Sequence, residues 1–162
     1  MIVRLGRSFS QKTKVDMQLK DQRRNTSYYR SKDFSNYCER FFNETVKPNQ
    51  SKVMIIRHAI SEGNEKHLIY GWTDYDLTPA GIQQAEKLQP VLSQYRERFS
   101  SINSSALKRT FNTGGTALGI GLNPPDNMIR RDARFNEFDF GPLEGIYTGK
   151  MDFFEHEVFF QM

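Results

Sequence analysis

The sequence predicts an α/β domain, because apolar strands and amphipathic helices alternate along its central part. A run of apolar and β-branched residues, Lys52 to Ala59, is typical of a strand buried on both faces of a sheet. A helix is expected from Thr78, then a short strand from Ser101 to Ala106 and a helix from Lys108 to Leu118. This order of strand, helix, strand and helix favours a parallel sheet.

The first long helix has a clear start signal. Thr78 is expected to cap it, with Pro79 at the first helical position, where a missing N–H costs nothing. Apolar residues then fall on one face at steps of three and four: Ile82, Ala85, Leu88, Leu92, Tyr95 and Phe99. Pro90 lies inside this pattern and predicts a kink or division of the helix. Gly114 and Gly115 are expected to weaken the later helix.

The N-terminal segment differs in composition from the rest of the chain. Residues 1–35 are polar and show no sustained helical or strand period, which predicts a disordered arm or a targeting segment. Arg4 and Arg7 among hydroxyl residues resemble a mitochondrial presequence, the alternative being an unstructured cytosolic tail. Residues 36–46 are expected to form a short helix at the edge of a partial domain that spans 36–162.

Composition narrows the classes of function. The single cysteine, Cys38, excludes an internal disulfide framework and leaves no cysteine and histidine cluster with zinc-ligand spacing, so a structural metal is not expected. No apolar run is long enough to predict a membrane span. The net charge is +4, but the first 50 residues carry +6 and residues 51–162 carry −2. We do not expect nucleic acid as a partner, because the basic residues accompany no recognised nucleic-acid module.

The candidate chemistry begins where the first strand ends. Arg57 and His58 are followed within six residues by Ser61, Gly63 and Asn64, which places a guanidinium, an imidazole and polar loop groups together. An arginine can bind two phosphate oxygens at once, and a neutral imidazole nitrogen can attack phosphorus. The pair alone fits a structural histidine at a strand end better than a nucleophile.

Four segments in order change that interpretation. They resemble the histidine phosphatase superfamily, which includes the phosphoglycerate mutases: RHAISEGN (57–64, with Ala59 in place of the usual glycine), GWTDYDLTPAGIQQA (71–85), SSALKRTFNT (104–113) and NEFDFGPLEG (136–145). The resemblance covers about residues 52–146. It implies a three-layer sandwich of the phosphoglycerate mutase type with a mainly parallel sheet, incomplete at the C-terminus.

The resemblance also implies a role for each matching residue, and it implies no metal and no organic cofactor. His58 would form a phosphohistidine, and Glu137 would protonate the leaving oxygen. The phosphate oxygens would be held by Arg57, Arg109 and Asn64, with Ser61 as a further contact. Two arginines beside the imidazole would keep it neutral and stabilise the transferring group.

One element of the family pattern has no match. The family uses a second histidine late in its domain, whereas His67 lies directly after the first motif and His156 only 19 residues after Glu137. We therefore interpret the chain as a C-terminally truncated domain or as a catalytically inactive relative. An aromatic tail, Phe153 to Phe160, would then need a protein partner to cover it.

Two functions follow from these observations. The first is a phosphomonoesterase acting through a phosphohistidine on a phosphorylated small molecule or phosphoprotein, with hydrolase favoured over mutase because the segment from Phe140 to Gly145 is more similar to the phosphatases. The second is a pseudo-phosphatase that serves as a structural or regulatory subunit of a larger assembly. The expected location is cytoplasmic or mitochondrial.

Overall fold

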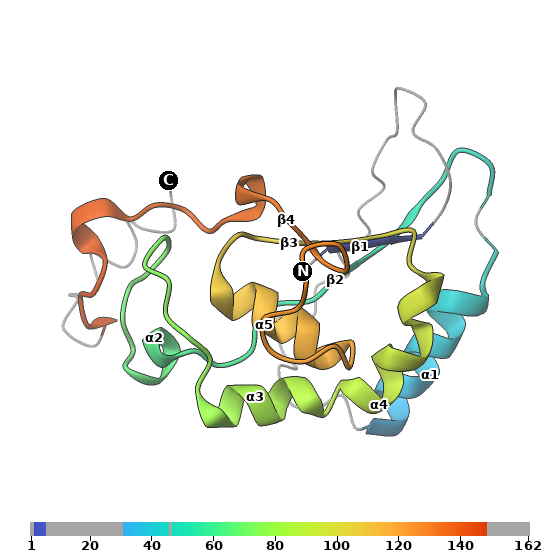
Figure 1. Cartoon of the computed structure of the whole chain (residues 1–162), viewed down its shortest axis with the longest axis horizontal. Helices are drawn as coiled ribbons and strands as arrows, with labels where there is room; N and C mark the ends of the chain where they lie inside the picture. Colours follow the sequence, from blue (N-terminus) through green and yellow to red (C-terminus); the bar gives the residue numbers. More distant parts are fainter. Residues whose placement is uncertain (1, 6–30, 46, 149–162) are drawn as a thin grey trace.

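A four-stranded sheet forms the centre of the chain. The computed structural model describes residues 2–5, 31–45 and 47–148 (Figure 1). The strands are β1 (Ile2–Leu5), β2 (Lys52–Ile55), β3 (Ser101–Ser104) and β4 (Arg130–Arg131), in the spatial order β2-β1-β3-β4. β1 pairs antiparallel with both neighbours, and β3 pairs parallel with β4. Hence β2, β3 and β4 run in one direction, and β1 runs against them.

β1 lies within the N-terminal segment that the sequence predicts to be a disordered arm or a targeting segment. The sequence predicts no secondary structure in residues 1–35, yet Ile2–Leu5 lies between β2 and β3, with Val3 opposite both Met54 and Ile102. Four residues are too few to show a period in the sequence, and the strand is held by backbone pairing to segments distant in the chain. The remaining arm, 6–30, and the aromatic tail with His156 lie outside the described residues.

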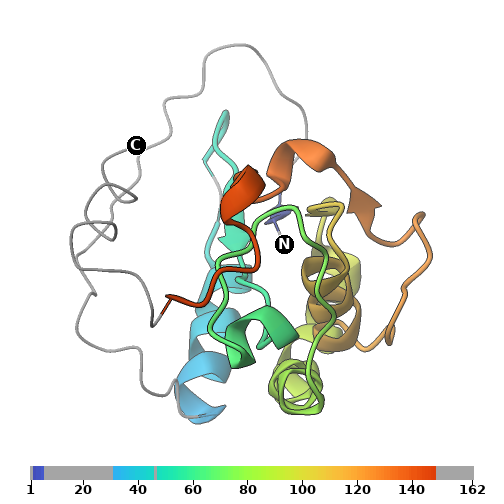
Figure 2. The same cartoon turned by 90° about the vertical axis from the view of Figure 1, so that its left-hand side faces the viewer.

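The helices lie on one face of the sheet, below it in Figure 1 and in the turned view of Figure 2. They are α1 (Ser31–Asn43), α3 (Pro79–Glu86), α4 (Gln89–Leu92) and α5 (Lys108–Ala117). The main core lies between them and the sheet: Cys38, Phe42, Met54, Leu92, Phe111, Ala117, Leu118 and Ile129. Phe42 stacks on Tyr95 at 4.0 Å between ring centroids, which joins α1 to the segment after α4. The predicted helix at 36–46 is therefore confirmed, although it begins earlier.

The exposure of β2 corrects the prediction of a strand buried on both faces. The strand ends at Ile55 rather than at Ala59, and only Met54 is buried. Val53 and Ile55 are 48% and 74% exposed on the opposite face. No α-helix of the described ranges covers that face in Figure 1, so these apolar side chains remain in contact with solvent.

The signals for α3 are confirmed. The hydroxyl oxygen of Thr78 accepts a hydrogen bond from the Gly81 N–H, and Pro79 occupies the first turn. The predicted division is present: α3 ends at Glu86, and α4 starts at Gln89 with Pro90 in its first turn. A 3₁₀ helix, Ser93–Arg98, follows α4 directly.

Gly115 in α5 does more than weaken a helix. A Cβ there would lie 2.3 Å from the backbone oxygen of Gly121, so the glycine permits a close approach of the loop that follows α5. This contact holds the loop against the helix. The remaining short helical segments are α2 (Glu62–Glu65), Ala133–Phe135 and Gly141–Leu143.

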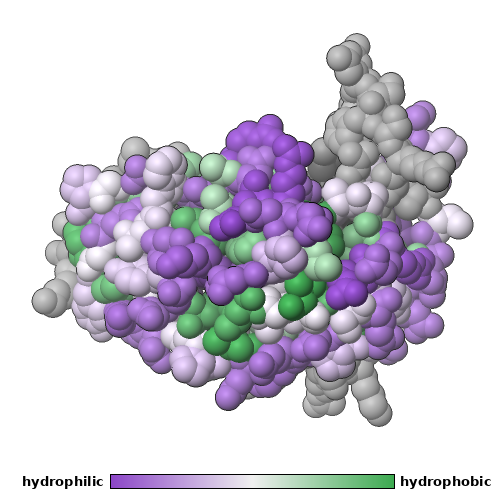
Figure 3. All heavy atoms as spheres, viewed as in Figure 1, coloured by the Kyte–Doolittle hydropathy of each residue, from purple (hydrophilic) through white to green (hydrophobic). Residues whose placement is uncertain are grey.

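The surface seen in Figure 3 is largely hydrophilic, with apolar atoms confined to separate patches. Within the described ranges, the helices are too short or too polar to traverse a bilayer. The same residues contain no group of three His, Cys, Asp or Glu side chains placed to hold a metal ion.

Candidate active site

His58 lies just beyond the C-terminal end of β2. Its Nδ1 is 2.8 Å from the carbonyl oxygen of Ala59. A carbonyl oxygen can only accept, so Nδ1 carries the hydrogen, and Nε2 keeps its lone pair. Burial lowers the pKa of His58 from its usual 6.5, and the charges of Arg109 and Arg57 lower it further, although the bond to Ala59 opposes them. The imidazole is therefore neutral at physiological pH and can act as a nucleophile.

Thr113 in α5 holds the backbone next to His58. Its hydroxyl oxygen accepts a hydrogen bond from the Ala59 N–H at 2.9 Å and donates to the carbonyl oxygen of Arg109 at 2.6 Å. Ala59 itself is buried against Leu77 and Ala85. One hydroxyl thus joins the loop that carries His58 to the helix that carries Arg109.

Arg109 is a buried cation. Its side chain is 2% exposed, and its two terminal nitrogens donate to the carbonyl oxygens of Thr73 at 3.0 Å and Gly71 at 2.6 Å. Its guanidinium carbon lies 4.7 Å from the centre of the Tyr70 ring. Within the described ranges no carboxylate forms a salt bridge with it, and its Nε has no hydrogen-bond partner. A buried charge without a counter-ion is costly, which favours an anion beside it.

Burial lowers the pKa of Arg109, and the nearby Tyr70, Asp74, Glu137 and Glu144 oppose that shift. The charge of Glu137 raises the pKa of Arg109, and the charge of Arg109 lowers the pKa of His58. The structure thus brings His58, Arg109 and Glu137 into one electrostatic neighbourhood. Glu137 is exposed, and its Oε1 accepts a hydrogen bond from the Phe138 N–H at 3.0 Å.

Ser61 and Asn64 are engaged with each other at the start of α2. The amide oxygen of Asn64 accepts from both the N–H and the hydroxyl of Ser61, at 3.1 and 3.0 Å. Because the single hydroxyl hydrogen of Ser61 is used there, the Tyr70 hydroxyl is the donor in its 2.6 Å contact with the Ser61 oxygen. A Cβ on Gly63 would meet the Tyr70 ring at 2.6 Å, so this glycine makes room for the tyrosine.

Glu144 holds the loop to which Arg109 is bound. Its carboxylate accepts from the backbone N–H groups of Gly71, Trp72 and Thr73 at 3.1, 2.7 and 2.6 Å, and from the Thr73 hydroxyl. It also accepts from the Phe140 N–H at 3.3 Å. Burial alone would raise the pKa of Glu144, but these hydrogen bonds outweigh it and lower the pKa from 4.5 to about 2. The carboxylate is therefore charged and fixes the loop at neutral pH.

The segments that carry these residues come together on one side of the molecule. In Figure 2, α2, the loop after it and the segment around 141–148 face the viewer. Backbone bonds join them, from Ile69 N–H to Ile146 O and from Gly145 N–H to Ile69 O. Arg57 is exposed just after β2, and His67 lies in the loop after α2 with its ring against Tyr147.

Three residues of this arrangement are not predicted from the sequence. Tyr70, Thr113 and Glu144 all lie in or beside the segments that suggest the chemistry, and none has a predicted role. Thr113 follows Arg109 by four residues, about one helical turn, which is a usable signal. The contacts of Glu144 join residues more than 70 positions apart, so no local pattern indicates them.

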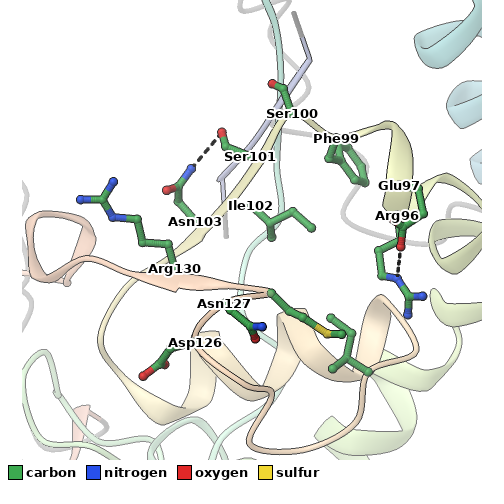
Figure 4. A pocket seen from close by; sticks show the side chains of 12 residues that line it. Arg96, Glu97, Phe99, Ser100, Ser101, Ile102, Asn103, Asp126, Asn127 and Arg130 are labelled. Atoms are coloured by element: carbon green, nitrogen blue, oxygen red, sulfur yellow. Dashed lines mark hydrogen bonds and ion pairs between the residues drawn. The ribbon is translucent and has the colours of Figure 1, made fainter.

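A cavity of about 440 Å³ lies elsewhere, beside β3 and β4 (Figure 4). Its walls contain none of the residues predicted to be catalytic. Two of its polar pairs are already satisfied internally, Arg96 with Glu97 at 3.1 Å and Asn103 with Ser101 at 3.3 Å. We therefore place the candidate chemistry at His58 and Arg109.

His58, a neutral histidine just beyond the end of a strand, and Arg109, a buried arginine with no salt bridge among the described residues, form a candidate site for phosphoryl chemistry on an α/β fold. A family model described as histidine phosphatase superfamily (branch 1) matches residues 53–156, which is more than half of the chain. The chain belongs to this superfamily.

Relatives of known name agree with this membership. The 2,3-bisphosphoglycerate-dependent phosphoglycerate mutase of Rhizobium etli is 37% identical over 94 residues, which are 58% of this chain and 44% of that protein. The enzyme of the same name from Nautilia profundicola is 37% identical over 97 residues, 59% of this chain and 42% of that protein. The chain spans less than half the length of these curated relatives.

A solved structure shows the same fold. The protein TTHB049 of Thermus thermophilus superposes with a TM-score of 0.50 at 30% identity, covering 65% of this chain and 55% of that one. The described part is accordingly an α/β fold of the phosphoglycerate mutase type, as the resemblance implied.

Proposed function

We propose that the chain carries part of the active site of a phosphomonoester hydrolase that works through a phosphohistidine on His58. The observation that carries this proposal is Arg109, a buried guanidinium with an unused Nε and no carboxylate partner among the described residues. A phosphate group would supply the missing counter-charge. His58 lies close enough to Arg109 for the charge of the arginine to lower its pKa, so a neutral nucleophile would lie beside that phosphate.

The proposed reaction has two steps. The Nε2 lone pair of His58 attacks phosphorus, the bond from phosphorus to the leaving oxygen breaks, and Glu137 gives its proton to that oxygen. A water molecule then attacks the phosphohistidine, the bond from phosphorus to nitrogen breaks, and Glu137 takes the proton of the water. Arg57 and Asn64 are proposed to contact the phosphate oxygens, with Ser61 positioned by Tyr70. The substrate is a phosphorylated small molecule or a phosphoprotein.

The curated relatives are named as mutases, so a mutase that also forms a phosphohistidine is an alternative to the hydrolase. In a mutase the phosphohistidine would pass its phosphoryl group to a second substrate instead of water. The segment from Phe140 to Gly145 supports hydrolysis. Incubation with 2,3-bisphosphoglycerate and 3-phosphoglycerate separates the two, because only a mutase would interconvert phosphoglycerates faster than it releases inorganic phosphate.

A pseudo-phosphatase that acts as a structural or regulatory subunit is a second candidate function. The observation in its favour is that both terminal nitrogens of Arg109 donate to the carbonyl oxygens of Gly71 and Thr73. An arginine committed to the backbone could stabilise the loop without binding substrate.

Labelling with a phosphate donor distinguishes these functions. The chain is incubated with radiolabelled para-nitrophenyl phosphate, and acid-labile, alkali-stable label is measured on the protein. We expect label in the wild type, none in His58→Ala and undiminished label in His67→Ala, which removes an exposed histidine from the next loop. Absence of both label and turnover in the wild type would contradict the hydrolase proposal and support the inactive subunit.

A further inference from the structure

We propose that Trp72 and Phe138 form an aromatic rim that selects phosphomonoesters with an aryl, uncharged leaving group. This inference rests on the proposed function, because it describes the leaving-group side of the same site. Both side chains are large, apolar and exposed, at 57% and 78%. Exposed aromatic groups beside a candidate active site indicate a surface that binds a ligand.

The position of Trp72 relative to the site is set by hydrogen bonds on both sides of it. The carbonyl oxygens of its neighbours, Gly71 and Thr73, accept from the buried guanidinium of Arg109. Its own backbone N–H donates to the Glu144 carboxylate at 2.7 Å. Trp72 therefore lies in the sequence between the two residues whose carbonyl oxygens bind Arg109, the arginine proposed to hold the phosphate.

The indole ring is oriented as well. Its Nε1–H donates to the backbone oxygen of Glu137 at 3.0 Å. Glu137 is the proposed proton donor, so the ring is held at the residue that contacts the leaving oxygen. This bond satisfies the polar edge of the indole and leaves its apolar faces free to pack against a ligand.

Phe138 belongs to the same rim because its backbone touches the loop of Trp72. A Cβ on Gly71 would lie only 1.6 Å from the backbone oxygen of Phe138, so these two segments are in direct contact. Phe138 also follows Glu137 directly, and its N–H binds the Glu137 carboxylate. Both aromatic residues are thus bonded to the proposed acid, one through its ring and the other through its backbone.

The geometry of the reaction places the leaving group at this rim. In an in-line displacement the leaving oxygen lies opposite the attacking His58, on the side of the acid that protonates it. The group attached to that oxygen must pass Glu137 and reach Trp72 and Phe138. An aryl group stacks favourably on such rings.

The charges of the rim disfavour an anionic leaving group. Phe138 lies in the sequence between the carboxylates of Glu137 and Asp139, and Glu144 is charged behind the Trp72 loop. A carboxylate or second phosphate on the leaving group would be repelled there. The rim therefore favours a neutral aryl group over an acidic one.

Binding of phosphonates tests this inference without any turnover. Trp72 is the single tryptophan of the chain, so tryptophan fluorescence reports on the rim alone. Phenylphosphonate, ethylphosphonate and phosphonopropionate share the head group and differ in an aryl, an alkyl and an acidic tail. We expect phenylphosphonate to bind about fivefold more tightly than ethylphosphonate, the gain typical of one aromatic contact, and phosphonopropionate to bind most weakly.

Variants connect the preference to the rim. Phe138→Ser should remove most of the preference for the phenyl ligand, whereas Leu122→Ser, at an apolar residue 48% exposed in the turn after α5, should keep it. Equal affinities for the phenyl and ethyl ligands, no binding of either, or an unchanged preference in Phe138→Ser would each overturn the rim. If no phosphohistidine forms but phenylphosphonate still binds more tightly than ethylphosphonate, the proposed hydrolysis is refuted and the aromatic rim is supported.

Discussion

The hydroxyl of Thr113 accepts a hydrogen bond from the backbone N–H of Ala59, the residue next to His58, at 2.9 Å. The same hydroxyl donates to the carbonyl oxygen of Arg109 one helical turn earlier. The position of the proposed nucleophile is thereby coupled to the helix that carries the buried cation. A threonine without direct access to substrate can in this way set the geometry of two groups that act on it.

Thr113→Val should remove this coupling while preserving side-chain shape. The buried Ala59 N–H would lose its acceptor, at a cost of about 1–3 kcal/mol in the free energy of unfolding. We expect the rate of phosphohistidine formation to fall about tenfold or more, since a misplaced nucleophile is slow. Rapid-quench labelling and chemical denaturation measure the two effects.

Thr116→Val is the matched control for that variant. Thr116 lies in the same helix and is also buried, but its hydroxyl has no hydrogen-bond partner within the described residues. Its replacement should be neutral or stabilising. Equal losses in the two variants would refute a specific role for the bond from Ala59 to Thr113.

Gly71→Ala should disrupt the loop beneath Arg109. The added Cβ would lie 1.6 Å from the backbone oxygen of Phe138, and backbone atoms cannot rotate away as a side chain can. We expect a loss of several kcal/mol in stability, about 3 or more. Gly121→Ala provides the comparison, because its Cβ would meet open space and only the positive φ of 103° opposes it, at about 1–2 kcal/mol. A Gly71 variant as stable as the Gly121 variant would disprove this packing.

Glu144→Gln should change how stability depends on acid. The pKa of Glu144 is lowered from 4.5 to about 2 in the folded chain, so its contribution is complete above pH 4.5 and disappears as the pH falls toward about 2. The glutamine cannot accept at both oxygens and should be less stable at neutral pH. Denaturation at a series of pH values should show the two proteins converging in acid. A difference that stays constant with pH would argue against a charged Glu144.

The labelling rate should depend on pH through His58. A protonated imidazole has no free lone pair, so the rate falls in acid, but the pKa of His58 is lowered below 6.5 by burial and by two arginines. With para-nitrophenyl phosphate, whose leaving group departs as a stable anion and needs no proton from Glu137, we therefore expect a rate that does not change from neutral pH upward and an acid limb below pH 6.5. Arg57→Gln removes one of the cations and should move that limb toward higher pH. A limb at or above neutral pH in the wild type would contradict a partly buried nucleophile with two arginines near it.

Local signals predicted the elements that local interactions stabilise. The cap at Thr78, the proline at the first turn and the division at Pro90 depend on neighbours within four residues, and all three are present. The chain's membership in the superfamily was equally readable, because its motifs are short and contiguous. The roles of the six candidate site residues remain proposals that the experiments above test: His58, Arg57, Ser61, Asn64, Arg109 and Glu137.

What the sequence determined by itself is therefore the order of the main strands and helices from Lys52 to Leu118 and the membership of the chain in the histidine phosphatase superfamily. Tertiary structure decided the rest: that Ile2–Leu5 lies inside the sheet, that β2 is exposed on one face, and that Glu144 and Arg109 bind one loop from two sides. These features depend on hydrogen bonds and packing between residues tens of positions apart. Such contacts form only when the whole chain folds, and no local pattern encodes them.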